Sequence, residues 1–188
     1  MTEVAYLASA VAFIVGLKLL GAPRTARTGN RIAATGMLAA IVTTLVSQDI
    51  VEWWTVVAGL IVGAALGAWF ALRVQMTAMP ELVAAFNGFG GIASALVAAV
   101  AVVQSDLDAL APETSVSILL SIVIGAVTFT GSFVAFGKLQ GTLPGRPVAF
   151  PGQHIVNGLL AAALVGVAIW AGVAGEAVGY WVVAGIAL

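Results

Sequence analysis

Residues 79 to 99 read MPELVAAFNGFGGIASALVAA, a run apolar enough to cross a lipid bilayer that nevertheless carries an asparagine in its first half. A hydrocarbon layer about 30 Å thick takes about 20 helical residues, so this stretch alone indicates a membrane span. An amide buried in hydrocarbon without a partner costs roughly 2 to 7 kcal/mol. Asn87 therefore needs either a hydrogen-bonding partner or a function.

The whole chain has the composition of a membrane protein. Of its 188 residues, 62% are hydrophobic and 8% are charged, whereas a soluble domain is about 45 to 50% apolar and about 25% charged. Helices and closed barrels satisfy every backbone group in lipid, and the chain nowhere sustains the two-residue alternation of a barrel strand. We predict an all-α, polytopic transmembrane helix bundle, with 1–188 as a single transmembrane domain and no soluble nucleotide-binding domain.

Seven apolar segments predict seven membrane spans. The segments are 3–21, 31–48, 53–74, 80–104, 114–138, 153–174 and 176–188. The seventh is short for a span, so we expect it to be a truncated helix that continues in the native chain. The first segment opens with acidic Glu3, where a cleavable signal peptide would be basic, which favours a true first span.

Charged residues alternate between the two sides of this predicted bundle. All seven basic residues fall at the first, third and fifth turns, and they are Lys18, Arg24, Arg27, Arg31, Arg73, Lys138 and Arg146. The acids at the N-terminus and the even turns are Glu3, Asp49, Glu52, Asp106, Asp108, Glu113 and Glu176, which leaves Glu81 as the one acid on the basic side. By the positive-inside rule the basic turns are cytoplasmic and the N-terminus lies outside, as in a multi-pass protein of the cell (inner) membrane.

Aromatic residues and a proline mark several predicted span ends. Trp53 and Trp54 begin one segment, and Tyr180 and Trp181 lie in the last. We expect these rings at the membrane interface, which amphipathic aromatic side chains prefer. Pro80 suits the first turn of a helix.

Small residues in two neighbouring segments predict close helix packing. They are Gly59, Gly63 and Gly67 in one segment and Gly88 and Gly91 in the next. Asn87 and Ser94 lie seven residues apart and so share one face of their helix. Two interpretations of Asn87 stay open: an interhelical hydrogen bond that holds the bundle together, or a channel group that holds water or orients a neighbour's imidazole.

Few side chains in the chain are of types that catalyse reactions, bind metals or carry protons. His154 is the single histidine and shares a helix face with Asn157, where an interfacial cap of backbone groups is the plain interpretation. No metal-ligand cluster, Walker motif, dinucleotide fingerprint or hydrolytic triad is present. We expect no catalytic residue, no metal, no nucleic-acid partner and no cofactor bound by this chain. Because no ionisable group lies near mid-span, a proton path would need a partner chain.

Three motifs closely resemble one membrane-protein family over essentially the whole chain. They are MPELVAAFNGFGG (79–91), GAVTFTGSFVAFGKLQG (125–141) and PGQHIVN (151–157), and they resemble the membrane domain of the beta subunit of proton-translocating nicotinamide nucleotide transhydrogenase. The resemblance implies hydride transfer between NADH and NADP+ coupled to proton translocation. It also implies separate soluble domains that bind NAD(H) and NADP(H), and a dimer of alpha-beta units in the lipid bilayer.

The resemblance further implies roles for individual residues. The position of the family's proton-site histidine holds Asn87 here, so a membrane helix of the alpha subunit is expected to supply the channel histidine. Asn87, Ser94, Glu81 and Ser132 would line the channel. Lys138, His154 and Asn157 would lie near the cytoplasmic face, where the NADP(H) domain docks.

Two functions of different classes remain. The chain is either the proton-channel portion of a transhydrogenase or a non-catalytic membrane anchor and packing scaffold of a larger complex. A small carrier with its own substrate is disfavoured, because no internal repeat is evident.

Overall fold

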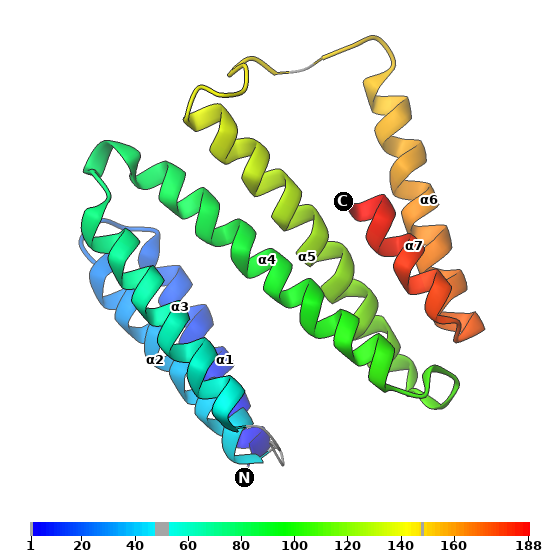
Figure 1. Ribbon diagram of the computed structural model, residues 1–188, viewed down its shortest axis with the longest axis horizontal. Coiled ribbons are helices and arrows are strands. Elements are labelled where there is room, and N and C mark those ends of the chain that lie inside the picture. The colour runs from blue at the N-terminus through cyan, green and yellow to red at the C-terminus, as the bar shows by residue number, and fades with distance from the viewer. Residues whose placement is uncertain (1, 48–52, 148) are drawn as a thin grey trace. The chain divides into compact units, whose positions relative to one another are not determined.

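The computed structural model describes residues 2–47, 53–147 and 149–188, and over this part of the chain it is helical with no β-strand (Figure 1). The α-helices are α1 Thr2–Leu20, α2 Ala26–Ser47, α3 Trp53–Arg73, α4 Met79–Gln104, α5 Pro112–Leu139, α6 Gln153–Ala174 and α7 Ala177–Ala187. Short 3-10 turns precede α4 and α5, at Met76–Ala78 and Leu107–Ala109. Six of the helices are long and apolar enough to cross a membrane, which confirms the predicted polytopic all-α class.

The second helix begins earlier than the hydropathy pattern predicted. We expected a start near residue 31, but α2 begins at Ala26 and includes two arginines. The turn before it is closed by the Thr25 hydroxyl, which donates to the Leu19 carbonyl oxygen at 2.6 Å. Hydropathy locates the edge of the apolar layer, whereas the helix extends beyond that edge through the sequence ARTGN, which contains no proline to end it.

The chain divides into two compact units, Met1–Leu66 and Gly67–Leu188, and each is described by itself. In the first unit α1 and α2 form a helical hairpin whose backbones approach closely at glycines. A Cβ atom added at Gly29 would lie 2.7 Å from the Gly16 carbonyl oxygen, and one at Gly36 would lie 3.0 Å from the Ser9 carbonyl oxygen. The two helices can approach this closely only because the glycines have no side chain.

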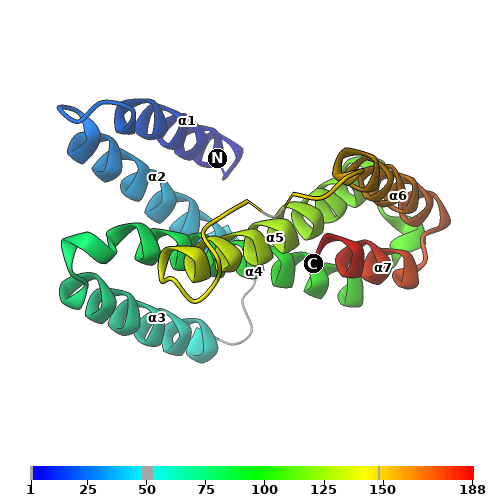
Figure 2. The same ribbon diagram turned by 90° about the horizontal axis from the view of Figure 1, so that it is seen from above.

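The second unit is built on the antiparallel pair α4 and α5, which run side by side in both views (Figures 1 and 2). A Cβ atom added at Gly91 would lie 2.7 Å from the Gly125 carbonyl oxygen, and one at Gly125 would lie 2.8 Å from the Ala95 backbone nitrogen. We call this contact, centred on Gly91 and Gly125, the glycine seam. It fixes how α4 and α5 are positioned against each other.

Helix α7 packs against α5 and α6 and completes the apolar core of the second unit. Tyr180 is 1% exposed and its hydroxyl lies 2.7 Å from that of Ser115 on α5. The Tyr180 ring therefore packs among the helices of this unit, and its expected place at the membrane interface stays a prediction. A tyrosine ring can be fully buried where its hydroxyl finds a partner, and Ser115 provides one, while Trp53, Trp54 and Trp181 remain exposed.

Not every predicted packing glycine meets a neighbour in this chain. A Cβ atom added at Gly59, Gly63 or Gly67 of α3 would meet nothing within 4 Å. Close packing at these positions stays a prediction.

The glycine seam predicts that Gly91→Ala destabilises the protein even though alanine favours helix formation by about 1 kcal/mol. The added methyl would overlap the backbone of α5, and overpacking of this kind costs about 1 to 3 kcal/mol. The matched control is Gly90→Ala, because a Cβ atom there meets nothing within 4 Å. Thermal unfolding in detergent should show a lower midpoint for Gly91→Ala alone; equal midpoints would contradict the seam.

The Ser115–Tyr180 hydrogen bond predicts a non-additive pair of substitutions. Tyr180→Phe leaves the buried Ser115 hydroxyl without its partner on α7, which costs about 1 to 3 kcal/mol. Adding Ser115→Ala to Tyr180→Phe should recover part of that loss, because no stranded hydroxyl then remains. A double-mutant cycle on detergent unfolding measures the coupling, and strict additivity would show that the two hydroxyls do not interact.

Candidate functional site

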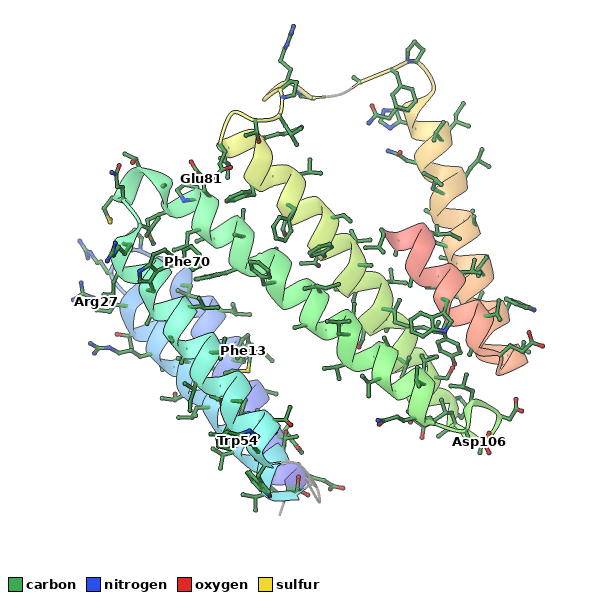
Figure 3. All side chains as sticks on the ribbon, viewed as in Figure 1. Phe13, Arg27, Trp54, Phe70, Glu81 and Asp106 are labelled. Atoms are coloured by element: carbon green, nitrogen blue, oxygen red, sulfur yellow. The ribbon has the colours of Figure 1, made fainter. Side chains whose placement is uncertain are left out.

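The candidate site begins at the start of α4, where sequence and helix geometry agree. Pro80 lies in the first turn of α4, and the next residue is Glu81, which is labelled in Figure 3. Proline is tolerated there because the first turn needs no backbone N–H, and a carboxylate there meets the positive end of the helix dipole. Glu81 is half-buried in the chain.

Asn87 lies two turns further along α4, and its side chain is hydrogen-bonded to α5. Its Nδ2 donates to Oγ of Ser132 at 2.8 Å. Ser132 is 8% exposed, whereas Asn87 is exposed in this chain. The structure thus brings together two of the four residues assigned to the channel, and it provides the partner that an amide in a membrane span requires.

The other side of the same helix pair is aromatic. The Phe133 ring covers Gly88, because a Cβ atom added at Gly88 would lie 2.8 Å from the ring's Cε2. Phe133 also packs edge-on against Phe89 of α4, with ring centroids 5.4 Å apart. The ring centroid of Phe129 lies 5.0 Å from that of Phe133. Gly88 is buried between these groups.

Helix geometry separates these polar and aromatic groups onto two flanks of α4. Residues 87 and 89 lie about 100° to either side of residue 88, which faces α5. Ser94 follows Asn87 by two turns and is likewise exposed, so Asn87 and Ser94 form what we call the polar flank. Phe89 and Leu96 form the opposite flank, and both are exposed, at 57% and 58%.

The amide of Asn87 keeps hydrogen-bonding capacity beyond Ser132. An asparagine side chain has two N–H donors and a carbonyl acceptor, so the bond to Ser132 engages one of three functions. Because Asn87 is exposed in this chain, the remaining donor and acceptor can bind water or a side chain of another helix. An amide does not titrate, so this site can orient a proton carrier but cannot itself be one.

The predicted coupling residues lie at the end of the unit where α4 starts. Lys138 belongs to the last turn of α5, and His154 and Asn157 belong to the start of α6. Lys138 is half-buried, and the other two are exposed. The segment between α5 and α6 therefore has polar side chains on either side of it.

Sequence reasoning missed Gly125 and Phe133, which hold the site together. Gly125, Thr128 and Ser132 recur at intervals of three and four residues, a small-residue stripe that predicts a packing face. Phe133 carries no such signal. Among the residues that the structure describes, no group of three His, Cys, Asp or Glu side chains could hold a metal ion. Asp49 and Glu52 of the charge pattern lie outside the described residues.

Comparisons with known proteins give a consistent result. The family model described as NAD(P) transhydrogenase beta subunit matches residues 2–188. NAD(P) transhydrogenase subunit beta of Rhodospirillum rubrum is 41% identical to this chain over 160 residues, which is 82% of this chain and 34% of the relative. The same protein from a named strain of that species gives the same values. The chain thus spans about a third of the length of the curated relatives it matches.

The Asn87–Ser132 hydrogen bond predicts energetic coupling between α4 and α5. Asn87→Ala and Ser132→Ala should each destabilise the helix pair, and the double variant should lose less than the sum. Interhelical bonds in membranes average about 0.6 kcal/mol and reach about 1.7 kcal/mol, so we expect a coupling free energy in that range. A double-mutant cycle measured by unfolding in detergent tests it, and a coupling of zero would contradict the bond.

Proposed function

This chain belongs to the family of NAD(P) transhydrogenase beta subunits, and on that premise we propose that it forms one wall of a proton path through the membrane. The observation that carries the proposal is the hydrogen bond from Asn87 to Ser132 at 2.8 Å, with the rest of the amide exposed. A polar group that faces outward from a membrane span is costly unless it meets water or another polar group. A path of water or polar side chains along this flank would satisfy it.

In this proposal the residues of the polar flank position a proton carrier. Ser132 accepts the hydrogen bond from Nδ2 and so fixes the Asn87 side chain. The carbonyl oxygen and second N–H of Asn87 then point a water molecule or an imidazole along the path, and Ser94 continues the polar surface two turns further. The glycine seam keeps α4 and α5 close enough for the hydrogen bond to persist.

The titrating group comes from a partner in this proposal. None of the polar-flank residues changes charge, and the resemblance to the family implies that a histidine on a membrane helix of the alpha subunit supplies the proton-binding site. The packing of that helix against the polar flank would be close, because Gly90 and Ser94 are small. Glu81, at the start of the same helix, lines the mouth of the path.

The coupling end faces the cytoplasm in this proposal. All basic residues fall at alternate turns of the chain, and the positive-inside rule assigns those turns to the cytoplasmic side of the cell membrane. Lys138, His154 and Asn157 lie at that end, where an NADP(H)-binding domain would dock. Hydride transfer between NADH and NADP+ takes place in soluble domains that bind NAD(H) and NADP(H), in a dimer of alpha-beta units.

The second candidate function is a membrane anchor and packing scaffold. It is favoured by the same hydrogen bond, because an interhelical bond between an amide and a hydroxyl joins two helices whether or not protons pass it. Under this alternative Asn87 matters for stability and assembly and leaves coupled transport unchanged.

Proton uptake into proteoliposomes driven by hydride transfer separates the two functions. In the complete complex, Asn87→Ala should lower coupled uptake by roughly tenfold or more, since misplacing a reacting group by about 1 Å costs about 100-fold. Hydride transfer in the isolated soluble domains, which do not contain Asn87, gives the reference rate of the chemical step alone.

The matched control variant is Thr130→Ala on α5. The Thr130 hydroxyl donates to the Ala126 carbonyl oxygen of its own helix at 3.1 Å, so its removal alters polarity two residues from Ser132 without touching the site. Thr130→Ala should pump as the unmodified complex does. If an assembled Asn87→Ala complex pumps as well as Thr130→Ala, Asn87 only joins helices and the scaffold function is supported.

A further inference from the structure

The α1–α2 hairpin carries a concentration of positive charge that the proton path does not use. Lys18 lies in the last turn of α1, Arg24 lies in the turn, and Arg27 and Arg31 lie in the first two turns of α2 (Arg27 in Figure 3). All four side chains are exposed. Residues 4–48 contain no Asp or Glu, so the one carboxylate in the hairpin is Glu3, in the first turn of α1 and thus at the opposite end of that helix from Lys18. We call these four residues the basic end.

The arginines face away from the neighbouring helix of the hairpin. Gly29 faces α1, since a Cβ atom there would lie 2.7 Å from the Gly16 carbonyl oxygen. Arg27 and Arg31 each lie two residues from Gly29, which is about 200° around the helix. Their side chains therefore leave α2 on its outer face.

The outer face of α2 becomes apolar directly beyond the arginines. Positions 27, 31, 34 and 38 follow one another at helical spacing, and the last two are the exposed Ala34 and Leu38, the latter 61% exposed. Arg31 precedes Ser47, the last residue of α2, by about 24 Å of helix rise. In a hydrocarbon layer about 30 Å thick, this places the arginines near the headgroups and the apolar stripe beside the acyl chains.

We propose that the basic end binds the phosphate headgroup of an anionic phospholipid, whose acyl chains lie along Ala34 and Leu38. Arginine presents a planar fork that matches phosphate oxygens in a bidentate manner, and clusters of basic residues beside a membrane helix attract anionic lipids. A free phosphate ion would bind the positive charges but would make no contact with the apolar stripe formed by Ala34 and Leu38. The turn that holds the cluster is ordered by the hydrogen bond from Thr25 to the Leu19 carbonyl oxygen.

The test is lipid retention by the purified membrane complex that contains this chain. The complex is titrated with phosphatidylglycerol or phosphatidylcholine in detergent, and bound lipids are counted by native mass spectrometry. We expect phosphatidylglycerol to bind in preference to phosphatidylcholine, and Arg27→Gln/Arg31→Gln to weaken its binding roughly 25-fold, from about fivefold for each arginine near an anionic surface. Inorganic phosphate at equal concentration should not displace the lipid.

A matched double variant separates the site from overall charge. Arg73→Gln/Arg146→Gln also removes two positive charges, from α3 and from the segment after α5, and it should bind phosphatidylglycerol as the unmodified complex does. Equal losses in the two double variants, or no loss in Arg27→Gln/Arg31→Gln, would overturn the proposal. It would also be overturned if phosphate displaced the lipid, or if the substitutions released a partner subunit and left lipid binding intact.

A conservative variant keeps the test valid if the glutamine variant does not assemble. Arg27→Lys/Arg31→Lys retains the charges that set membrane topology and removes the planar fork. It should hold phosphatidylglycerol several-fold more weakly than the unmodified complex, and equal binding would contradict a phosphate site made by arginine.

Discussion

The carbonyl oxygen of Gly91 lies where a Cβ atom on Gly125 would be only 2.6 Å away, so α4 and α5 meet backbone to backbone. In a bilayer, lipid tails are as apolar as leucine side chains, and helices associate through close packing and interhelical hydrogen bonds. The glycine seam provides the close packing, and it brings Asn87 within reach of Ser132 for the interhelical hydrogen bond. The candidate site exists because these two glycines have no side chains.

The seam also gives the helix pair two unlike flanks. Phe133 closes over Gly88 on one side and forms an aromatic cluster with Phe89, while Asn87 and Ser94 lie on the other. A neutral amide held by a neutral hydroxyl can orient a proton carrier, and it leaves the titration itself to a group from another chain. In the proposed function, this division of roles lets a chain whose spans carry no ionisable residue near their middle form one wall of a proton path.

Much of the fold could be predicted from the sequence, because hydropathy measures where a helix enters and leaves the apolar layer. The starts of α3 and α6 lie at the predicted residues, and the need of Asn87 for a partner followed from its depth alone. Hydropathy carries no information on which way a side chain points around the helix. For that reason the packing of the Tyr180 ring among other helices was not predicted, and Gly125 was missed although it faces Gly91.

Neighbours in space are decided by the arrangement of helices, which local patterns do not specify. The resemblance to a known family placed Asn87 and Ser132 in one channel, but the hydrogen bond between them required the antiparallel pairing of α4 and α5. The glycines of α3 illustrate the converse, since their spacing predicts packing but does not say which helix packs against them. A small-residue stripe indicates that another helix can pack closely against it, but it does not identify that helix.

In the proposed function, the polar flank of α4 borders a water-filled path, and the opposite flank with Phe89 and Leu96 does not. The chain contains no cysteine, so single cysteines can report on each flank in the assembled complex. A small, water-soluble thiol reagent should modify Asn87→Cys and Ser94→Cys, and it should leave Phe89→Cys and Leu96→Cys unmodified. Equal modification on the two flanks, or protection of positions 87 and 94, would show that no water-filled path follows the polar flank.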